Sequence, residues 1–397
     1  MPAVILFDDP IFRPQLLPLT YTRPVAELRC GIQTISEKWS SVLDSPVSYL
    51  TETYLSTKFP VNYSSDNLLI NGSLCPDQDI LKSITDLEKE SALFSADGVL
   101  LALRTGKSWK TEDGIKGFKP VHYPGIPTLI REVWHIFSFN AAQIKADFER
   151  LTLNKKSASI TDPFTHCYNK ENIFIEEGVV IKASILNAEN GPIYISRDAL
   201  IQEGSMVQGP FFIGEGSVLA QGAKIRPNTT IGPFCKVGGE VSNIVILGYS
   251  NKGHDGYLGN SVLGEWCNLG ANTNNSNLKN DLSPVKLHSY ATNKLKNTGL
   301  QNCGLIMGDY SKAGISTMFN TGTVVGVSVN VFGAGFQDKH IPSFSWGGAA
   351  EGISEYRFQK ALHVAADTVV RRNVDFGETD EKILHHIFEQ TQMQRSI

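Results

Sequence analysis

The chain has 397 residues, of which 41% are apolar and 19% are charged, a globular composition with room for two or three domains. With 36 basic and 40 acidic residues the net charge is −4, so the sequence lacks the basic excess that is typical of nucleic-acid-binding proteins. No apolar run reaches the ~18 residues that a membrane-spanning helix needs, and we expect no membrane partner.

The first 152 residues have the pattern of an α/β domain. Apolar segments that read as strands lie at 3–7, 67–71 and 98–104, and helix-like segments lie at 32–42 and 141–151. This alternation of strands and helices predicts an α/β fold. No basic region or cleavage site precedes the first strand, so we expect no signal peptide and a cytoplasmic location. The polar residues 153–172 are expected to form a linker.

The six cysteines lie far apart and form no CxxC pair. They are Cys30, Cys75, Cys167, Cys235, Cys267 and Cys303. In a chain of this length such spacing is typical of reduced cytosolic thiols. We therefore expect neither a disulfide framework nor a zinc site.

A six-residue period dominates residues 173–347. Ile, Leu or Val stands at eight successive positions spaced six residues apart, and shorter runs with this period lie on either side. The main run is Ile195, Ile201, Val207, Ile213, Leu219, Ile225, Ile231 and Val237, and the others are Ile175 and Ile181, and Met307, Ala313, Phe319, Val325 and Val331. Helices repeat every three or four residues and half-buried strands every two. A step of six instead predicts a hexapeptide β-helix, in which short strands each point one apolar side chain into a shared core. The alternative is a β-meander with an accidental period.

The period is interrupted once and then ends. Residues 272–302 are rich in asparagine and are expected to form a loop that protrudes from the solenoid. After Gly348 the apolar residues change to helical spacing, as in Phe358, Leu362 and Ala365. We therefore expect two helices within 348–397 that pack on the solenoid or cap its end.

A dense motif at 252–277 carries a family resemblance. The residues that match the family pattern are His254, Tyr257, Leu258, Gly259, Asn268, Gly270, Ala271, Thr273 and Asn277. The motif resembles the acetyltransferase half of the GlmU-like family, whose bifunctional members are UDP-N-acetylglucosamine pyrophosphorylases and glucosamine-1-phosphate acetyltransferases. The closest resemblance is to the divergent sugar-nucleotidyltransferase branch of this group. The resemblance implies a Rossmann-like nucleotidyltransferase domain, then a left-handed β-helix that assembles as a homotrimer.

The resemblance also implies roles for residues of the solenoid. His254 corresponds to the general base that takes a proton from a sugar amine, and imidazole suits that task. The residues expected to bind the sugar are Arg226, Tyr257, Asn268 and Asn277, with Lys252 or Lys279 replacing a family lysine where this chain has Glu240. The residues expected beside acetyl-CoA, against a neighbouring subunit, are Gly308, Asp309, Gly326 and Val327. Plain packing of the solenoid coils is the alternative for these four.

Residues 17–25 resemble a phosphate-binding segment of sugar nucleotidyltransferases. The nucleotide and phosphate candidates are Arg13, Thr20, Arg23, Asn71 and Gly72, with Asp8 and Asp9 as weak candidates for binding Mg²⁺. The sequence departs from the family pattern in three places. The Gly-rich loop is absent, Val25 replaces a lysine, and Ser73 replaces the metal-binding carboxylate. The residues 8–25 either bind nucleotide in another arrangement or are a structural remnant.

Three functions therefore remain open from the sequence. The first is a UDP- or dTDP-sugar pyrophosphorylase fused to an acetyltransferase that acts on an amino-sugar phosphate. The second is an acyltransferase with an inert N-terminal domain. The third is a non-catalytic nucleotide-sugar-binding protein or trimeric scaffold.

Overall fold

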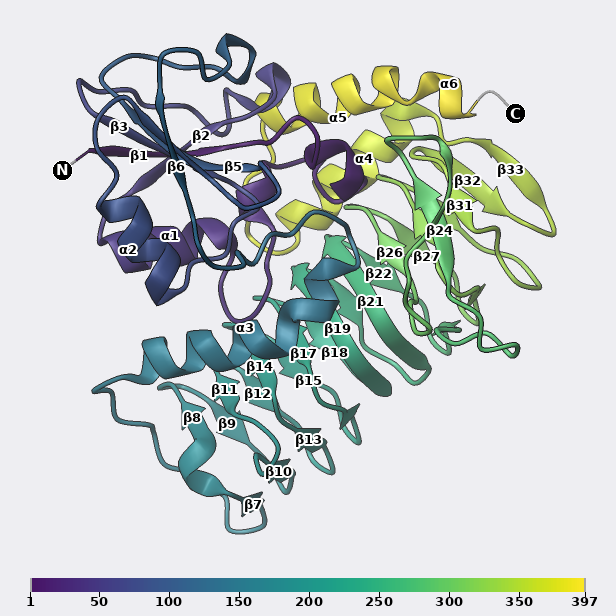
Figure 1. Ribbon diagram of the computed structural model, residues 1–397. Coiled ribbons are helices and arrows are strands. Elements are labelled where there is room, and N and C mark those ends of the chain that lie inside the picture. The colour runs from purple at the N-terminus through teal and green to yellow at the C-terminus, as the bar shows by residue number, and fades with distance from the viewer. Residues whose placement is uncertain (1, 396–397) are drawn as a thin grey trace. The chain divides into compact units, whose positions relative to one another are not determined.

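The computed structural model describes residues 2–395, which form two compact units (Figure 1). The N-terminal unit comprises the chain up to Leu16, Thr22–Leu28 and Gln33–Glu132. The C-terminal unit comprises Leu17–Tyr21, Arg29–Ile32 and the chain from Val133 onward. No helix of the described residues is long and apolar enough to cross a membrane.

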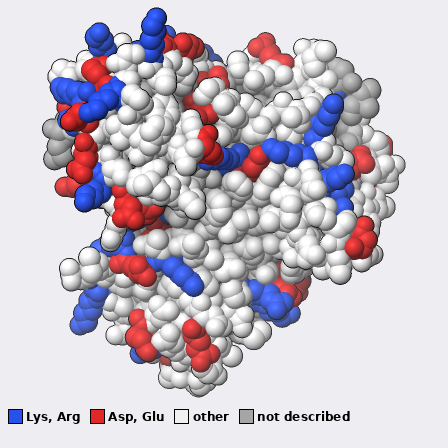
Figure 2. All heavy atoms as spheres, viewed as in Figure 1, with Lys and Arg blue, Asp and Glu red and all other residues white. Residues whose placement is uncertain are grey.

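Charged side chains of both signs are interspersed on the face shown in Figure 2. Small groups of acidic and basic residues alternate there, and large areas carry no charge. On this face there is no extended single-sign field of the kind that attracts nucleic acid.

The N-terminal unit is built on a six-stranded sheet with the order β2-β1-β3-β5-β4-β6. The strands are β1 (Ala3–Phe7), β2 (Val47–Leu50), β3 (Asn67–Asn71), β4 (Ser91–Phe94), β5 (Leu100–Thr105) and β6 (Lys119–His122). Strand β1 pairs in parallel with β2 and β3, whereas β5 is antiparallel to both of its neighbours. The helices are α1 (Ile35–Leu43) and α2 (Gln78–Thr85), with short 3-10 segments η1 (Arg13–Leu16), η2 (Val25–Glu27), η3 (Thr53–Leu55) and η4 (Thr111–Asp113). The predicted α/β fold is confirmed.

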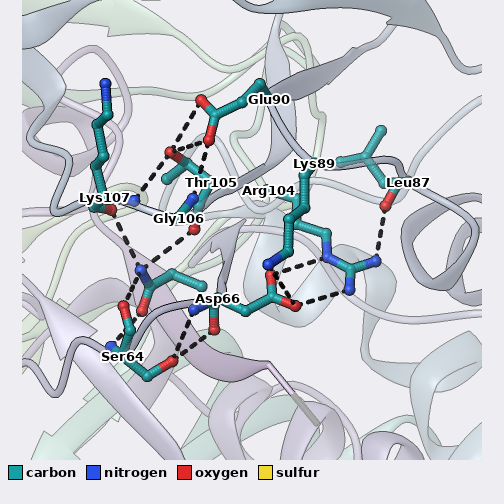
Figure 3. Close-up of polar contacts among 10 residues, drawn as sticks. Ser64, Asp66, Leu87, Lys89, Glu90, Arg104, Thr105, Gly106 and Lys107 are labelled. Atoms are coloured by element: carbon teal, nitrogen blue, oxygen red, sulfur yellow. Dashed lines mark hydrogen bonds and ion pairs between the residues drawn. The ribbon is translucent and has the colours of Figure 1, made fainter.

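Polar side chains fix the ends of β3 and β5 (Figure 3). The Arg104 guanidinium donates from Nε and Nη2 to the two carboxylate oxygens of Asp66, at 3.0 and 2.9 Å. The hydrogen bond from Arg104 lowers the pKa of Asp66. On the other side of β5, Glu90 accepts hydrogen bonds from the Thr105 hydroxyl and the Gly106 amide. Such paired contacts hold the register of the antiparallel strands.

The C-terminal unit is a parallel β-solenoid, and its core is the predicted six-residue series. Each of the residues named above for that period is buried, and none is more than 7% exposed. Residues that pair in register on neighbouring coils lie three six-residue steps apart in the sequence, as in Leu200 and Val218. One coil therefore consists of three strands, and each strand buries one apolar side chain. The parallel β-helix is confirmed, and its left-handedness stays a prediction.

The solenoid has three faces, which we name A, B and C by their strands. Face A contains β7 (His166–Tyr168), β10 (Ile185–Asn187), β13 (Met206–Gln208), β16 (Lys224–Ile225) and the first residues of β19 (Glu240–Gly248) and β21 (Tyr257–Glu265). Face B contains β8 (Ile173–Ile175), β11 (Ile193–Ile195), β14 (Phe211–Ile213), β17 (Thr229–Ile231), the last residues of β19 and β21, β26 (Ile306–Met307), β29 (Val324–Val325) and β31 (His340–Ile341).

Face C is a separate ten-stranded sheet. Its strands are β9 (Val180–Ile181), β12 (Leu200–Ile201), β15 (Val218–Leu219), β18 (Lys236–Val237), β20 (Asn251–Lys252), β22 (Asn268–Leu269), β27 (Lys312–Ala313), β30 (Asn330–Val331), β32 (Ser345–Gly348) and β33 (Gly352–Glu355). Strand β33 is antiparallel to β32 and ends the sheet. A further parallel pair joins β23 (Asn274–Asn275) to β28 (Met318–Phe319).

Helix α3 (His135–Thr152) packs on face B rather than on the N-terminal sheet. Its Ile144 contacts Phe174, Tyr194 and Phe212, and its Asn140 amide donates to the Asn228 carbonyl at 2.9 Å. Helix α3 therefore belongs to the C-terminal unit. The boundary between the two units lies at Glu132–Val133, whereas the predicted domain limit is residue 152. The short η5 (Lys170–Asn172) follows between the first coil strands.

The predicted loop at 272–302 contains regular structure, so that prediction was wrong in part. It begins with β23 and continues into an antiparallel hairpin of β24 (Lys286–Ser289) and β25 (Lys294–Asn297). The hairpin is tied to the solenoid by tertiary contacts, because the His288 ring stacks on His340 of β31 at 3.6 Å.

The C-terminal helices are α4 (Phe358–Val370), α5 (Glu378–Gln390) and the short α6 (Gln392–Arg395). They bury Ala361, Ala365 and Val369 of α4, and Ile383, Leu384 and Ile387 of α5. The Lys312 ammonium of β27 donates to the Thr368 hydroxyl, so α4 lies along face C. The prediction of two helices packed on the solenoid is confirmed, with one additional short helix.

Candidate functional sites

The first candidate site is a polar network where β21 begins on face A. The Asn277 amide donates to the Tyr257 hydroxyl at 3.1 Å and to the side-chain oxygen of Asn260 at 2.7 Å. Burial raises the pKa of Tyr257, so its hydroxyl keeps its proton at neutral pH. The network offers hydroxyl and amide groups that donate and accept hydrogen bonds, as recognition of a sugar requires.

Two charged residues lie beside this network. Glu240 is the register partner of Tyr257, and the Arg226 guanidinium forms an ion pair with Glu240 at 3.1 Å. The side chain of Arg226 is 60% exposed, so its remaining donors face solvent. The predicted sugar residues Arg226, Tyr257 and Asn277 are therefore brought together, with an acid beside them.

The packing of Tyr257 requires a glycine at position 259 of this motif. A Cβ atom at Gly259 would collide with the ring and hydroxyl of Tyr257. The Gly259 amide donates to the Asn275 side-chain oxygen at 2.8 Å. The Tyr257 side chain therefore lies over the bare backbone of its own strand.

His254 lies in the turn between β20 and β21, three residues before Tyr257. It is exposed, and its imidazole has no hydrogen bond within residues 2–395. The His254 carbonyl accepts a 2.6 Å hydrogen bond from the Lys252 ammonium. The turn thus presents an accessible imidazole on an anchored backbone.

Lys252 occupies an interior position of the solenoid. It is the register partner of the buried Val237 and is itself only 2% exposed. Burial lowers the pKa of Lys252 to about 8. Because its ammonium points into the solenoid and is used by the His254 carbonyl, Lys252 does not replace the missing family lysine, contrary to our expectation. Lys279 is likewise engaged, with the Ser283 hydroxyl at 3.0 Å and the Pro284 carbonyl at 3.1 Å.

Asn268 lies apart from this network. It belongs to β22 on face C, where its side-chain oxygen accepts a long 3.5 Å hydrogen bond from Asn251. Within one chain, Asn268 therefore does not join Tyr257 and Asn277.

The four residues expected near acetyl-CoA are buried in the coil stack. Asp309 is 2% exposed, and one of its oxygens accepts the Glu265 amide at 2.9 Å. Gly308 packs directly on the backbone of Gly326, and the Val327 amide donates to the Ser343 hydroxyl. Each of them has a packing role within its own chain, which is the alternative given above.

The second candidate site lies at the end of β1 in the N-terminal unit. Asp8 and Arg13 form a buried ion pair at 2.6 Å. Asp8 also accepts hydrogen bonds from the Val25 amide at 2.8 Å and the Thr51 hydroxyl at 2.5 Å. The guanidinium of Arg13 donates further to the Arg23 carbonyl and the Tyr54 hydroxyl. Asp8 and Arg13 hold the residues 8–25 together.

This ion pair lines a cavity of about 300 Å³. The other charged groups around the cavity are Glu52, Lys110 and Glu112. Three carboxylates therefore face two cations, which is an unfavourable balance for a triphosphate.

The metal candidates are occupied by protein groups. Asp9 accepts the amides of Ile11 and Phe12 on one oxygen, and the Asn71 amide on the other at 3.3 Å. The Ser73 hydroxyl is buried and has no hydrogen-bond partner among the described residues. Among the residues that the structure describes, no three acidic, histidine or cysteine side chains are grouped so that they could hold a metal ion. The side chains as they lie do not fit a divalent cation.

The remaining N-terminal candidates are buried. Gly72 packs against the Phe7 carbonyl and Ala26, and Arg23 is 5% exposed. Thr20 is fully buried and belongs to Leu17–Tyr21, a segment of the C-terminal unit. The structure therefore brings Asp8, Arg13 and Arg23 together in the N-terminal unit.

Sequence reasoning missed two groups that complete these sites and one, Lys312, that lies elsewhere on the solenoid. Asn260 joins the Tyr257 network, Tyr54 contacts Arg13, and Lys312 lies under α4. Asn260 follows Gly259 within the matched motif and could have been found there. No sequence signal marks Tyr54 or Lys312, because their contacts depend on tertiary packing.

Comparisons with known proteins agree with this architecture. Residues 4–156 match the family described as sugar nucleotidyl transferase, which confirms the predicted type of the N-terminal domain. The chain is 34% identical to "Bifunctional protein GlmU" of Methanocaldococcus jannaschii, over 43% of this chain and 39% of that protein. It is 31% identical to "Bifunctional sugar-1-phosphate nucleotidylyltransferase/acetyltransferase" of Sulfurisphaera tokodaii, over 40% and 37%.

A third relative is "Uncharacterized acetyltransferase YaiX" of Escherichia coli, at 26% identity over 44% of this chain and 74% of that protein. The matches span less than two fifths of the length of the two bifunctional relatives. Together, the family match and these relatives support the resemblance to the GlmU-like family.

Proposed function

Because this chain is similar to the GlmU-like family, we propose that it is a sugar-1-phosphate nucleotidyltransferase of the UDP- or dTDP-sugar pyrophosphorylase type, fused to an acetyltransferase. The acetyltransferase part acts on an amino-sugar phosphate and uses acetyl-CoA as the donor. The observation that carries the proposal is the Tyr257–Asn277–Asn260 network at the start of β21, with the exposed imidazole of His254 in the turn three residues before Tyr257.

The acyl transfer follows from the roles of these residues. Tyr257 and Asn277 hold hydroxyls of the sugar, and the exposed donors of Arg226 approach its phosphate. The His254 imidazole takes a proton from the sugar amine as the amine nitrogen attacks the acetyl carbon of the thioester. A C–N bond forms, the C–S bond breaks, and the coenzyme A thiolate leaves and is protonated.

Release of the coenzyme A thiol from acetyl-CoA tests this proposal. With a panel of hexosamine phosphates, wild type should release thiol, and His254→Asn should be about 100- to 10,000-fold slower because an amide cannot accept the proton. His166→Asn is the matched control, because His166 is an exposed histidine of β7 on the same solenoid. A His254→Asn variant as fast as the wild type would contradict the assignment.

A second candidate, acetyl transfer alone, is favoured by the N-terminal site. Asp8 and Arg13 neutralise each other, and Ser73 stands where a carboxylate is expected. Mixing a nucleoside triphosphate, a sugar 1-phosphate and Mg²⁺ distinguishes the two candidates. Pyrophosphate release that is lost in Arg23→Gln supports nucleotidyl transfer, and no release across a panel of sugars and bases supports the second candidate.

The proposed assembly is a homotrimer formed through the solenoid. Face A exposes apolar side chains on neighbouring coils, with Tyr168 52% exposed, Ile185 39% and Met206 44%. Ile185 and Met206 are register partners, so they form one patch that another copy can cover. In such a trimer a neighbour could also supply the groups that Asn268 lacks. A cytoplasmic location stays a prediction from the sequence.

A further inference from the structure

A cavity of about 410 Å³ lies between face C and helix α4, away from the Tyr257 network. Its solenoid wall comprises Tyr249, Asn251, Trp266, Cys267, Asn268 and Lys312, and its helix wall comprises Val364, Asp367, Thr368, Arg371 and Arg372. Cavities of several hundred Å³ with a few polar groups are the usual size of small-molecule sites. The acetyl-transfer proposal assigns no role to α4.

Lys312 is a half-buried cation of this cavity. Its ammonium donates to the Thr368 hydroxyl at 3.2 Å, and no carboxylate of the described residues lies within ion-pair distance. Burial lowers the pKa of Lys312, as expected for an ammonium that lacks a nearby negative charge. Partial burial of a charge that has only neutral partners carries a cost, and a bound anion would offset that cost.

Two arginines at the end of α4 add positive charge. Arg372 donates to the side-chain oxygen of Asn251 at 2.8 Å and to the Phe234 carbonyl at 3.2 Å. Arg371 is exposed, and its guanidinium has no hydrogen bond within residues 2–395. Cations at a helix C-terminus are common because they complement its dipole, so the arginines alone would not indicate a site. Together with Lys312 they give the cavity three cations against the single carboxylate of Asp367.

The aromatic residues restrict the ligand. Tyr249 and Trp266 stack on each other with centroids 4.3 Å apart, and the stack continues to Phe234 and Tyr310. Their ring faces are therefore occupied, so the cavity offers an apolar wall but no open platform for a nucleobase. This wall suits a flexible apolar chain that ends in an anionic group.

We propose that this cavity binds the phosphate group of an organic phosphate, with Lys312 as its half-buried contact, Arg371 at its edge, and the aromatic wall against the rest of the ligand. Coenzyme A and nucleoside phosphates share this chemistry. The ring stacking favours coenzyme A, whose pantetheine arm is a chain rather than a ring. The site contains neither His254 nor the Tyr257 network, although Asn268, one of the predicted sugar residues, is part of its wall.

Titration calorimetry on the full chain tests the proposal with coenzyme A and with UTP. Lys312→Met keeps the length of the side chain and removes its charge, and binding of the ligand should weaken about tenfold or more. Arg371→Gln should weaken binding less, because its charge is exposed to solvent. Lys236→Gln is the matched control, since Lys236 is an exposed lysine in the same row of face C, outside the cavity.

The outcomes separate this site from the proposed activity. Binding that is lost in Lys312→Met but retained in Lys236→Gln and His254→Asn supports the cavity, whichever ligand it is. If coenzyme A binds more tightly than UTP, the ligand of the cavity is coenzyme A. If UTP binds more tightly, the ligand is a nucleotide. Equal affinity in wild type and in a folded Lys312→Met would overturn the proposal, as would no binding of either ligand by wild type.

Discussion

Lys252 is a lysine at an apolar position of the solenoid core. It is buried beside Val237 in register, and its ammonium holds the His254 carbonyl at 2.6 Å. Burial of the charge destabilises the folded chain, and it lowers the pKa of Lys252 to about 8. The same contact fixes the backbone of the turn that presents the proposed general base. Lys252 therefore acts as a positioning residue.

The charge of Lys252 should make stability depend on pH. Folding lowers its pKa from 10.5 to about 8, so the unfolded chain binds this proton more tightly than the folded chain. The destabilisation is complete below pH 8 and disappears as the pH rises toward 10.5. Compared with Lys252→Met, wild type should gain about 3 kcal/mol in free energy of unfolding over this range.

Urea unfolding of both chains at pH values below and above 8 measures this difference. A difference between wild type and Lys252→Met that does not change with pH would show that the lysine is not buried as a charged group.

At the level of elements, β21 carries the Tyr257 network on its first residues. The hydroxyl of Tyr257 lies over Gly259 of the same strand, and Asn277 approaches it from the segment after β23. A small displacement of Tyr257 would break its contact with Asn277. Displacements of about 1 Å cost catalysts about 100-fold in rate.

Gly259→Ala should therefore lower acetyl transfer by about 100-fold while leaving the solenoid folded. The matched control is Gly248→Ala in β19, where a Cβ atom would meet neighbours only at ordinary distances of 3.5 Å. Rates of thiol release, with circular dichroism to follow the fold, decide the outcome. If Gly259→Ala has the same rate as Gly248→Ala, the position of Tyr257 does not matter.

The solenoid coils could be predicted because their rule is local. One residue in six is buried whatever the distant sequence is, so Ile213 and Val325 follow from spacing alone. The hairpin β24–β25 could not be predicted, because it depends on the stacking of His288 on His340, which lies 52 positions along the chain. The same holds for α3, whose sequence shows a helix but not that it packs on face B.

The candidate site was predictable to the extent that its motif is contiguous. Tyr257 and Asn277 meet as the motif implies, whereas Lys252 points inward because its register pairs it with Val237. Spacing along the chain does not reveal which face a residue occupies after an irregular coil. For the same reason Asn268, within the same motif, lies on face C and not on face A.

At the scale of the whole molecule, the proposed acetyl transfer needs more than one chain. Asn268 is apart from Tyr257 within the chain, and face A exposes the apolar patch of Ile185 and Met206. A trimer would cover this patch, and it would bring a second chain to the sugar site.

Light scattering should therefore give a mass of three chains in solution. Met206→Glu, which places a charge in the patch, should shift the mass toward one chain, whereas Val180→Glu on face C should not. A wild-type mass of one chain would contradict the trimer and the shared site.

The most direct test of the whole account is to identify the products of one reaction mixture. The protein is incubated with acetyl-CoA, a hexosamine 1-phosphate, UTP and Mg²⁺, and the products are separated and identified by mass spectrometry. We predict an N-acetylated sugar phosphate that disappears in His254→Asn, together with a nucleotide sugar formed by the N-terminal domain. If neither product forms with any hexosamine phosphate or nucleoside triphosphate, the chain binds such ligands without turning them over, and the account of an enzyme is wrong.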